Sequence, residues 1–294
     1  MKNAIDRAKI LVEALPYIRQ FHGKVIVIKC GGELIANEEV KENIAQDMAL
    51  MRFVGIKPVL IHGGGPQVTN LLERLGKKAE FSEGMRKTDK ETVEVVEMVL
   101  GKINKDLVSL INRTGTHAVG LSGKDGKLIK AKKLNSSKGE DLGMVGEVEE
   151  INLSIIKALD NENNLPNGEG FIPVIAPLGV TNDGLTLNIN ADIVAAELAV
   201  ALKAEKMIIL TNQPGILKDI KDERTLISTI PVSEIDLLIK KEIIRGGMMP
   251  KVNACKKAIL GGVKKTHIID GRISHSILLE VFTDKGVGTE ITKK

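Results

Sequence analysis

Two lysines and one aspartate are the residues of this sequence best suited to chemistry on a phosphate. Lys29 ends the apolar run IVIKCGG, where a lysine is awkward unless it points into a polar cleft. Lys251 follows the double glycine of RGGMMPKV near an expected helix start, and Asp192 stands in the first turn of the helix in NINADIVAAELA. Two such lysines could neutralise the charge that develops on a transferring phosphoryl group. The ordinary alternatives are a solvated strand-end lysine and charges near helix ends.

Two glycine clusters follow two early strands. Gly31 and Gly32 come after KVIVIKC, and Gly63, Gly64 and Gly65 come after KPVLIH. Glycines at the carboxyl ends of parallel strands let backbone N–H groups approach an anion, and the start of the following helix adds partial positive charge. Open α/β sheets bind ligands at this edge. One cluster alone would indicate only a tight turn, whereas two on adjacent strands predict a binding edge.

Three further polar residues are candidates for binding a substrate. Arg86 in SEGMRKTDKETVE precedes an expected helix with Thr88 or Asp89 as its cap. Its planar guanidinium suits a bidentate clamp on a carboxylate, although most such arginines lie at the surface. Asn188 and Asn190 precede the next apolar helix, and Asn190 in particular is a plausible N-cap.

The common nucleotide-binding and catalytic motifs are missing from the sequence. No GxxxxGK[ST] occurs and no GxGxxG opens the first helix, which disfavours P-loop NTPases and dinucleotide-binding dehydrogenases. The protein-kinase motifs HRD and DFG are absent too. His62 has no Ser-His-Asp or metal-ligand companions. An acceptor carboxylate, with a reference pKa of about 4, is already ionised at neutral pH and requires no general base.

The pattern of elements indicates an α/β fold. From Lys24, short apolar strands alternate with amphipathic helices, which predicts a mainly parallel sheet covered on both faces. Residues 128–152 have the turns and short β-like pieces of an antiparallel excursion. We expect two lobes that share one continuous sheet, residues 1–189 and 190–294. Residues 3–20 predict an extra amphipathic helix, interrupted by Pro16, that packs on its own domain or docks on another subunit.

Composition narrows the class of protein. A chain of 294 residues with 43% hydrophobic residues can bury a substantial core. Its 42 basic residues are scattered among 38 acidic ones and aromatic residues make up 2%, so nucleic acid is not expected as a partner. Neither a signal peptide nor a membrane-spanning stretch is expected. Cys30 and Cys255 lack metal-site spacing and indicate reduced thiols in a cytoplasmic protein.

The motifs KCGG, HGGGPQV, GMRKTD, NINAD and GGMMPKV occur in the order and context of the amino-acid kinase family. This resemblance runs over nearly the whole chain, from ALPYIRQFHGKVIVIK to VGTEI. It implies a three-layer αβα sandwich with an acylamino-acid lobe followed by an ATP-binding lobe. The activity it implies is ATP-dependent phosphorylation of the γ-carboxylate of N-acetyl-L-glutamate, in arginine biosynthesis. Mg²⁺ would arrive with ATP and bridge phosphate oxygens more than it binds protein ligands.

The resemblance also implies roles for individual residues. Lys29 and Lys251 would stabilise the transition state, and Asp192 would hold both lysines. Arg86 would bind the α-carboxylate of the substrate. The implied substrate-binding residues are Gly64, Gly65, Arg86, Asn188 and Asn190, and the implied nucleotide-binding residues are Gly31, Gly32, Thr211, Asn212, Gly215, Ile216 and Leu217.

Two departures from the family pattern lie in the expected nucleotide segment. An aspartate is usual where this chain has Asn212, and Gln213-Pro214 is unusual there as well. These departures concern the contacts with ATP and leave the assignment of the lobe unchanged.

The N-terminal helix and the ending HSILLEVFTDKGVGTEI resemble the arginine-inhibited, hexameric branch of the family. Tyr17, His267 and Glu280 would then belong to an arginine site, with Glu280 facing the guanidinium. Alternative functions are phosphorylation of another carboxylate or carbamate acceptor by a member of the same family, or arginine sensing without catalysis. The presence of both lysines together with Asp192 disfavours the sensor, which needs no converging lysines.

Overall fold

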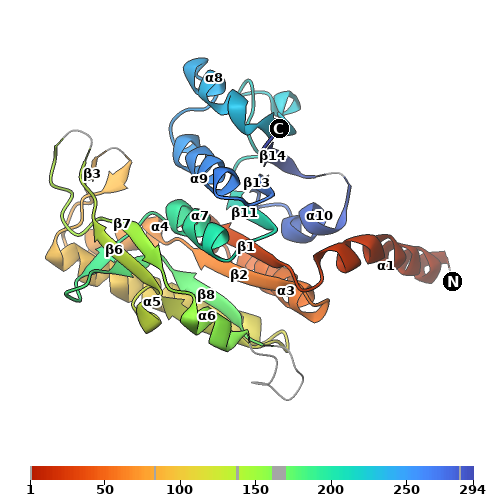
Figure 1. Ribbon diagram of the computed structural model, residues 1–294, viewed down its shortest axis with the longest axis horizontal. Coiled ribbons are helices and arrows are strands. Elements are labelled where there is room, and N and C mark those ends of the chain that lie inside the picture. The colour runs from red at the N-terminus through yellow and green to blue at the C-terminus, as the bar shows by residue number, and fades with distance from the viewer. Residues whose placement is uncertain (1, 83, 137–138, 161–169, 285) are drawn as a thin grey trace.

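The computed structural model describes residues 2–82, 84–136, 139–160, 170–284 and 286–294. Its centre is an eight-stranded sheet in the order β12-β14-β13-β11-β1-β2-β8-β5 (Figure 1). Neighbouring strands are parallel except β13 and β14, so β14 and its parallel neighbour β12 run opposite to the rest. These strands are β1 (Val25–Cys30), β2 (Lys57–His62), β5 (Ala118–Ser122), β8 (Ile172–Ala176), β11 (Lys206–Thr211), β12 (Thr229–Pro231), β13 (Lys265–Asp270) and β14 (Gly288–Thr292).

Helices cover both faces of this sheet, as the sequence predicts. One face packs against α3 (Glu38–Phe53), α5 (Lys90–Asn112) and α10 (Ser276–Phe282), and the other against α7 (Ala191–Ala201) and α9 (Met248–Leu260). Alternate residues of β1 divide between two cores because successive side chains of a strand point to opposite faces. Ile26 and Ile28 join the α3 and α5 side, while Val27 joins the α7 and α9 side. The predicted three-layer αβα sandwich is confirmed.

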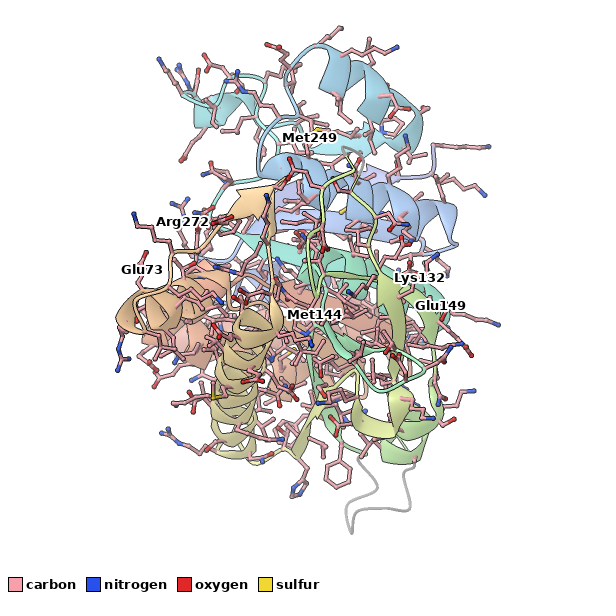
Figure 2. All side chains as sticks on the ribbon, turned by 90° about the vertical axis from the view of Figure 1, so that its left-hand side faces the viewer. Glu73, Lys132, Met144, Glu149, Met249 and Arg272 are labelled. Carbon is pink, nitrogen blue, oxygen red and sulfur yellow. The ribbon has the colours of Figure 1, made fainter. Side chains whose placement is uncertain are left out.

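A smaller four-stranded sheet, in the order β10-β9-β6-β7, lies beside α7. Its pair β6 and β7 is antiparallel, which confirms the predicted excursion, although Ser137 and Lys138 within it lie outside the described residues. Figure 2 shows Lys132 on β6 and Glu149 on β7 at the outer surface of this sheet. The strands are β6 (Ile129–Lys133), β7 (Gly146–Ile151), β9 (Leu178–Val180) and β10 (Thr186–Asn188), and a separate pair joins β3 (Phe81–Ser82) to β4 (Met85–Arg86).

Among the described residues, the remaining helices are short, apart from the first. They are α1 (Lys2–Phe21), α2 (Gly32–Ile35), α4 (Gly65–Arg74), α6 (Ser154–Leu159) and α8 (Ile235–Lys240), with 3₁₀ turns at Asp125–Lys127, Glu223–Thr225 and Val232–Glu234. In the part of the chain that is described, no helix is both long enough and apolar enough to cross a membrane.

The N-terminal helix projects from the body and contacts it near α10 (Figure 1). The predicted interruption at Pro16 is wrong, because α1 runs from Lys2 to Phe21 with Pro16 inside it. Proline removes one backbone donor and strains the preceding turn, but the turns on either side keep the helix continuous here. Phe21 is buried and anchors its end, whereas Leu11 is 71% exposed.

The two cysteines lie in different cores and do not form a disulfide. Cys30 packs on the α3 side of the sheet and Cys255 on the α9 side, and both are free thiols. Burial raises the pKa of each thiol to about 12. Both side chains therefore stay protonated at neutral pH, as expected for packed residues without a chemical role.

The order in which the strands follow one another along the chain switches sides of the sheet between β1 and β11. Strands β2, β8 and β5 extend from β1 on one side, while β11 and β13, which come late in the chain, extend on the other. Strands from residues 1–189 and 190–294 therefore meet where β1 pairs with β11. A crevice outside the carboxyl ends of such strands is where open α/β sheets bind ligands.

Candidate active site

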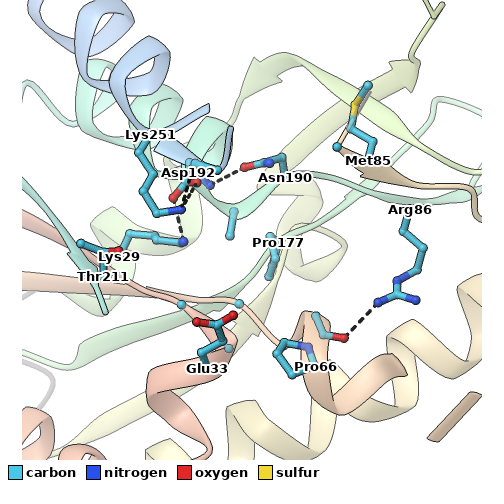
Figure 3. Close-up of a pocket in the computed structure, with 18 of the residues that line it drawn as sticks. Lys29, Glu33, Pro66, Met85, Arg86, Pro177, Asn190, Asp192, Thr211 and Lys251 are labelled. Carbon is cyan, nitrogen blue, oxygen red and sulfur yellow. Dashed lines mark hydrogen bonds and ion pairs between the residues drawn. The ribbon is translucent and has the colours of Figure 1, made fainter. Parts of the chain in front are cut away.

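A cavity of about 680 Å³ opens at this point of the sheet (Figure 3). Its lining comes from the carboxyl ends of β1 and β11, the glycine turns after β1 and β2, and the first turns of α7 and α9. The predicted site residues that line it are Lys29, Gly31, Gly32, Gly64, Gly65, Arg86, Asn188, Asn190, Asp192, Thr211, Asn212 and Lys251.

The two lysines converge on Asp192 from two sides. Lys29 Nζ lies 2.7 Å from Asp192 Oδ1, and Lys251 Nζ lies 3.6 Å from Asp192 Oδ2 (Figure 3). The Lys29 side chain is 7% exposed and that of Lys251 is 21% exposed, so Lys251 is the more open of the two cations. The strand-end lysine of the sequence thus points into a polar cleft.

The position of Asp192 follows from the helix that carries it. Asn190 caps α7 as predicted, since its Oδ1 accepts a 2.8 Å hydrogen bond from the Asp192 N–H. Burial by itself would raise the pKa of Asp192, but the charges and hydrogen bonds of Lys29 and Lys251 outweigh it, so the pKa lies below its usual value. The carboxylate therefore stays ionised at neutral pH, and the cluster has two positive charges against one negative charge.

The glycine turns pack against each other at the base of the cavity. A Cβ on Gly32 would lie 2.8 Å from Pro66 Cδ and 3.0 Å from Gly64 Cα, so a larger residue would push the turns apart. Gly65, by contrast, has no heavy atom within 4 Å of that position. It begins α4, whose first N–H groups have no partner within the helix and can face an anion.

One amino group of Arg86 has protein partners and the other has none among the described residues. Its Nη2 donates to the Gly65 carbonyl at 2.9 Å and to Thr69 Oγ1 at 2.6 Å. Its guanidinium also lies 4.8 Å from the centre of the Phe81 ring. Burial lowers the pKa of Arg86, but an arginine remains charged at neutral pH. Its Nη1 is buried and has no hydrogen-bond partner among the described residues, which leaves a donor for a ligand.

Asn188 is the remaining predicted substrate contact. It lies on β10 and donates from Nδ2 to Thr88 Oγ1 at 3.4 Å. Asp89, one of the two predicted caps, accepts from the Thr92 N–H at the start of α5. This cap fixes the segment that joins Arg86 to α5.

The predicted nucleotide segment divides into two parts. Thr211 and Asn212 line the cavity, but Gly215, Ile216 and Leu217 are buried behind it. The Ile216 N–H donates to Thr289 Oγ1 at 2.8 Å. Gly215 has a φ of +145°, in a region that favours glycine, and a Cβ there would lie 2.7 Å from Thr289 Oγ1. These three residues shape the loop from behind.

Sequence reasoning missed Glu33 and Arg245, which also line the cavity. Glu33 directly follows the first glycine pair, and Arg245 precedes the second double glycine, so their neighbours in the sequence were the available signal. Among the described residues, no three His, Cys, Asp or Glu side chains gather in a metal-binding group.

The predicted arginine-site residues lie elsewhere, around α10. Glu280 Oε1 is 2.8 Å from His267 Nδ1, and both side chains are buried. Burial would raise the pKa of Glu280, but the hydrogen bond and charge of His267 and the charge of Lys206 lower it below its usual value. Tyr17 on α1 donates from its hydroxyl to Asp284 just beyond α10. The structure thus brings α1 to the helix that carries Glu280.

Comparisons with known proteins show which proteins this chain is similar to. Residues 24–270 match the sequence model of the amino acid kinase family. The acetylglutamate kinase of Desulforamulus reducens is 53% identical over 291 residues, covering 99% of both chains. That of Moorella thermoacetica is 54% identical over 295 residues, covering 98% of this chain and 97% of the relative.

Solved structures also resemble this fold. N-acetylglutamate synthase from Neisseria gonorrhoeae, complexed with coenzyme A and L-arginine, matches 98% of this chain and 65% of its own, with a TM-score of 0.82 and 26% identity. Carbamate kinase from Giardia lamblia bound to AMP-PNP matches 92% of this chain and 99% of its own, with a TM-score of 0.65 and 19% identity. At that identity the carbamate kinase supports the fold alone.

Proposed function

The chain belongs to the amino acid kinase family, and from this premise we propose that it transfers the γ-phosphoryl group of ATP to the γ-carboxylate of N-acetyl-L-glutamate. The product is N-acetyl-L-glutamyl 5-phosphate, an intermediate of arginine biosynthesis. The observation that carries the proposal is the cluster of Lys29, Asp192 and Lys251, which faces the same cavity as Arg86. The full-length similarity to acetylglutamate kinases supports this choice of acceptor.

The surplus positive charge of the cluster accounts for the phosphoryl transfer. Asp192 neutralises one lysine, so the second charge is available for the transferring group, whose oxygens carry the negative charge of the transition state. A γ-carboxylate oxygen attacks the γ-phosphorus, the bond to the β-phosphate oxygen breaks, and ADP leaves. No proton has to be removed because the acceptor is ionised at neutral pH.

The two ends of the substrate have different partners in this proposal. Arg86 Nη1 binds the α-carboxylate, while the N–H groups at Gly64 and Gly65 face the γ-carboxylate. Asn188 and Asn190 line the wall between these points. Such positioning converts the reaction into one between groups held in contact.

ATP occupies the side of the cavity formed by Gly31, Gly32, Thr211 and Asn212, and Gly215, Ile216 and Leu217 support that loop. Mg²⁺ would come with ATP and reduce the repulsion among its phosphates. Among the described residues, the carboxylates that line this cavity are Asp192 and Glu33. Both have protein partners, so phosphate oxygens and water would supply most of the Mg²⁺ ligands.

Hydroxylamine trapping tests the reaction directly. ATP and N-acetylglutamate should yield a hydroxamate, because an acyl phosphate reacts with hydroxylamine and a phosphate ester does not. The same assay with aspartate, glutamate and N-acetylaspartate, and an ADP-release assay with carbamate and UMP, compares the acceptors. Faster turnover of any of these acceptors than of N-acetylglutamate would refute the assignment.

The same chain forms, in our proposal, a hexamer that arginine inhibits. Support comes from the exposed apolar residues of α1, Leu11, Val12 and Leu15, and from the anionic Glu280 beneath the helix. An arginine guanidinium would share that carboxylate with His267. The ligand must bind the inactive arrangement more tightly than the active one, because only differential affinity shifts an equilibrium.

Deleting residues 1–20 tests this proposal. We expect the truncated chain to form dimers with intact activity that arginine does not affect. Mass in solution and the arginine response are measured on the same preparation. A truncated protein that stays hexameric and fully arginine-sensitive would show that α1 neither links subunits nor contributes to the arginine site.

A further inference from the structure

The turn after β1 and the turn after β11 leave neighbouring parallel strands, at the point where the strand order switches sides of the sheet. Cys30 pairs with Leu210 across these two parallel strands. The chain beyond Cys30 enters α2, and the chain beyond Leu210 enters the predicted nucleotide segment. Side chains from the two halves of the protein can therefore meet directly at this edge of the cavity.

One hydrogen bond makes that connection. Asn212 Nδ2 donates to Glu33 Oε2 at 2.6 Å, across 179 positions of sequence, and both residues line the cavity. Figure 3 shows the Glu33 carboxylate pointing into the cleft, across from Lys251. An ionised carboxylate only accepts hydrogen bonds, so it fixes which end of the Asn212 amide faces it. The Asn212 oxygen is then turned away from Glu33 and can accept a hydrogen bond.

Both partners stand on fixed backbone. The Gly32 carbonyl accepts a 2.7 Å hydrogen bond from Gln67 Nε2, which ties α2 to α4. The Thr211 carbonyl accepts a 2.8 Å hydrogen bond from the Gly271 N–H at the end of β13. Leu34 is buried and would lie 2.5 Å from a Cβ at Gly271, so α2 also packs directly on the other half of the sheet.

We propose that Glu33 and Asn212 form a clasp across the nucleotide end of the cleft, in which Glu33 sets the orientation of Asn212 toward ATP. Glu33 is a positioning residue, since it acts through Asn212. The clasp also keeps the Glu33 charge engaged at the rim, so it does not turn freely toward the phosphates. This inference rests on the proposed function, because it names the ligand of that end of the cavity as ATP.

A reciprocal exchange of the two groups tests the clasp. N212D places two carboxylates in contact, and we expect KM for ATP to rise about 5- to 10-fold from their repulsion. E33Q keeps an acceptor without its charge, and we expect a rise of about 2-fold because the pair is exposed to solvent. In E33Q/N212D the amide introduced by the first substitution donates to the carboxylate introduced by the second, so KM for ATP should return to within about 2-fold of the wild type.

Comparing KM for ATP with KM for N-acetylglutamate separates a positioning role of Glu33 from general damage to the fold. KM for N-acetylglutamate should stay unchanged in all three variants, since Arg86 and the glycine turn are untouched. E38Q is the matched control, because Glu38 is an exposed acid at a nearby helix start that pairs with Lys41 away from the cavity. ATP binding by calorimetry should follow the same order as the kinetic values.

Two outcomes would overturn the clasp. One is additivity, in which KM for ATP is at least as high in E33Q/N212D as in N212D alone. The other is an equal rise of KM for ATP and KM for N-acetylglutamate. A wild-type protein that fails to produce a hydroxamate would instead refute the proposed function. ATP calorimetry on the same four proteins would then still decide whether the two side chains are coupled.

Discussion

Two carboxylates in this protein are similarly buried but have different surroundings. Asp192 is 4% exposed and Glu280 is 6% exposed, and nearby cations lower the pKa of both. Asp192 stands between two lysines that line a cavity. Glu280 contacts one buried histidine and accepts a 3.2 Å hydrogen bond from the Val287 N–H.

The two sites differ in their balance of charge and in whether a ligand can reach them through a cavity. At Asp192 two cations share one anion, so a positive charge is left for a ligand that enters the cavity. At Glu280 both partners are enclosed by the protein. A buried ion pair alone says little about function, because desolvation offsets much of its attraction. The surplus charge facing the cavity is what distinguishes the proposed site of phosphoryl transfer at Asp192 from the pair at Glu280.

Removing either lysine should have the largest effect. We expect Lys29→Ala or Lys251→Ala to lower kcat by a factor on the order of 10²–10³ with far smaller changes in KM, since the lost interaction is strongest in the transition state. Lys102→Ala is the control, because Lys102 forms an exposed pair with Asp106 on α5. Steady-state kinetics on the three variants is the measurement. Near-normal turnover would remove that lysine from the mechanism.

Substituting Asp192 by asparagine tests whether its negative charge positions the two lysines. The change preserves shape but leaves two lysines without their shared anion, so we expect kcat to fall about 10²-fold as both lysines lose their positions. Asp106→Asn is the matched exposed substitution. The kcat values and the thermal unfolding midpoints of both variants are compared. A variant with wild-type kcat would show that Asp192 does not position the lysines.

Figure 3 shows Arg86 across the cavity from Lys29 and Lys251, so we expect its substitution to affect substrate binding more than turnover. Arg86→Lys keeps the charge but loses the planar fork that reaches both Gly65 and the ligand, so we expect KM for N-acetylglutamate to rise about 10-fold, with KM for ATP unchanged. Arg224→Lys serves as control, because Arg224 forms an exposed bidentate pair with Asp222. An equal rise in both KM values would contradict the clamp.

The sequence predicted the frame of this site better than its contacts. Alternating apolar strands and amphipathic helices gave the αβα class, and the capping roles of Asn190 and Asp89 followed from local chemistry. Local periodicity does not predict how far apart Lys29, Asp192 and Lys251 lie in the folded protein. These three residues come together because β1 pairs with β11. No single motif in the sequence predicts that pairing.

The residue that was missed and the prediction that was wrong have different origins. Glu33 could not be identified from the sequence because its partner, Asn212, lies 179 positions away. The sequence shows that Asn212 departs from the family pattern, but it does not show that Glu33 contacts it. Pro16 was expected to interrupt α1, but the flanking turns hold the helix together. The nucleotide-binding roles of Gly215, Ile216 and Leu217 stay predictions, since these three residues lie outside the lining of the cavity and the Ile216 N–H donates to Thr289.

We expect the smallest change in kcat from substituting Glu280, the enclosed carboxylate, in contrast to the large change expected for Lys29 and Lys251. Glu280→Gln should leave kcat within about 2-fold of the wild type, because no transition-state charge reaches it. Its free energy of unfolding at pH 7 should fall by about 1–2 kcal/mol, since the ionised hydrogen bond to His267 is lost in a buried place. Urea unfolding of both proteins measures this difference. Glu147→Gln, in an exposed pair with Lys132, is the control.

The pH dependence of that difference follows from the direction of the pKa shift. The folded state lowers the pKa of Glu280 below its ordinary value of 4.5, so the unfolded chain takes up the proton first as the pH falls. The stability that the carboxylate contributes is therefore fully present above pH 4.5 and is lost as the pH falls through the folded pKa. The difference between the unfolding free energies of wild type and Glu280→Gln should therefore be larger at pH 7 than in acid, and it should shrink as the pH falls through the folded pKa of Glu280. A gap that widens on acidification would mean that Glu280 is held protonated in the folded protein, and its ionised pairing with His267 would then be wrong.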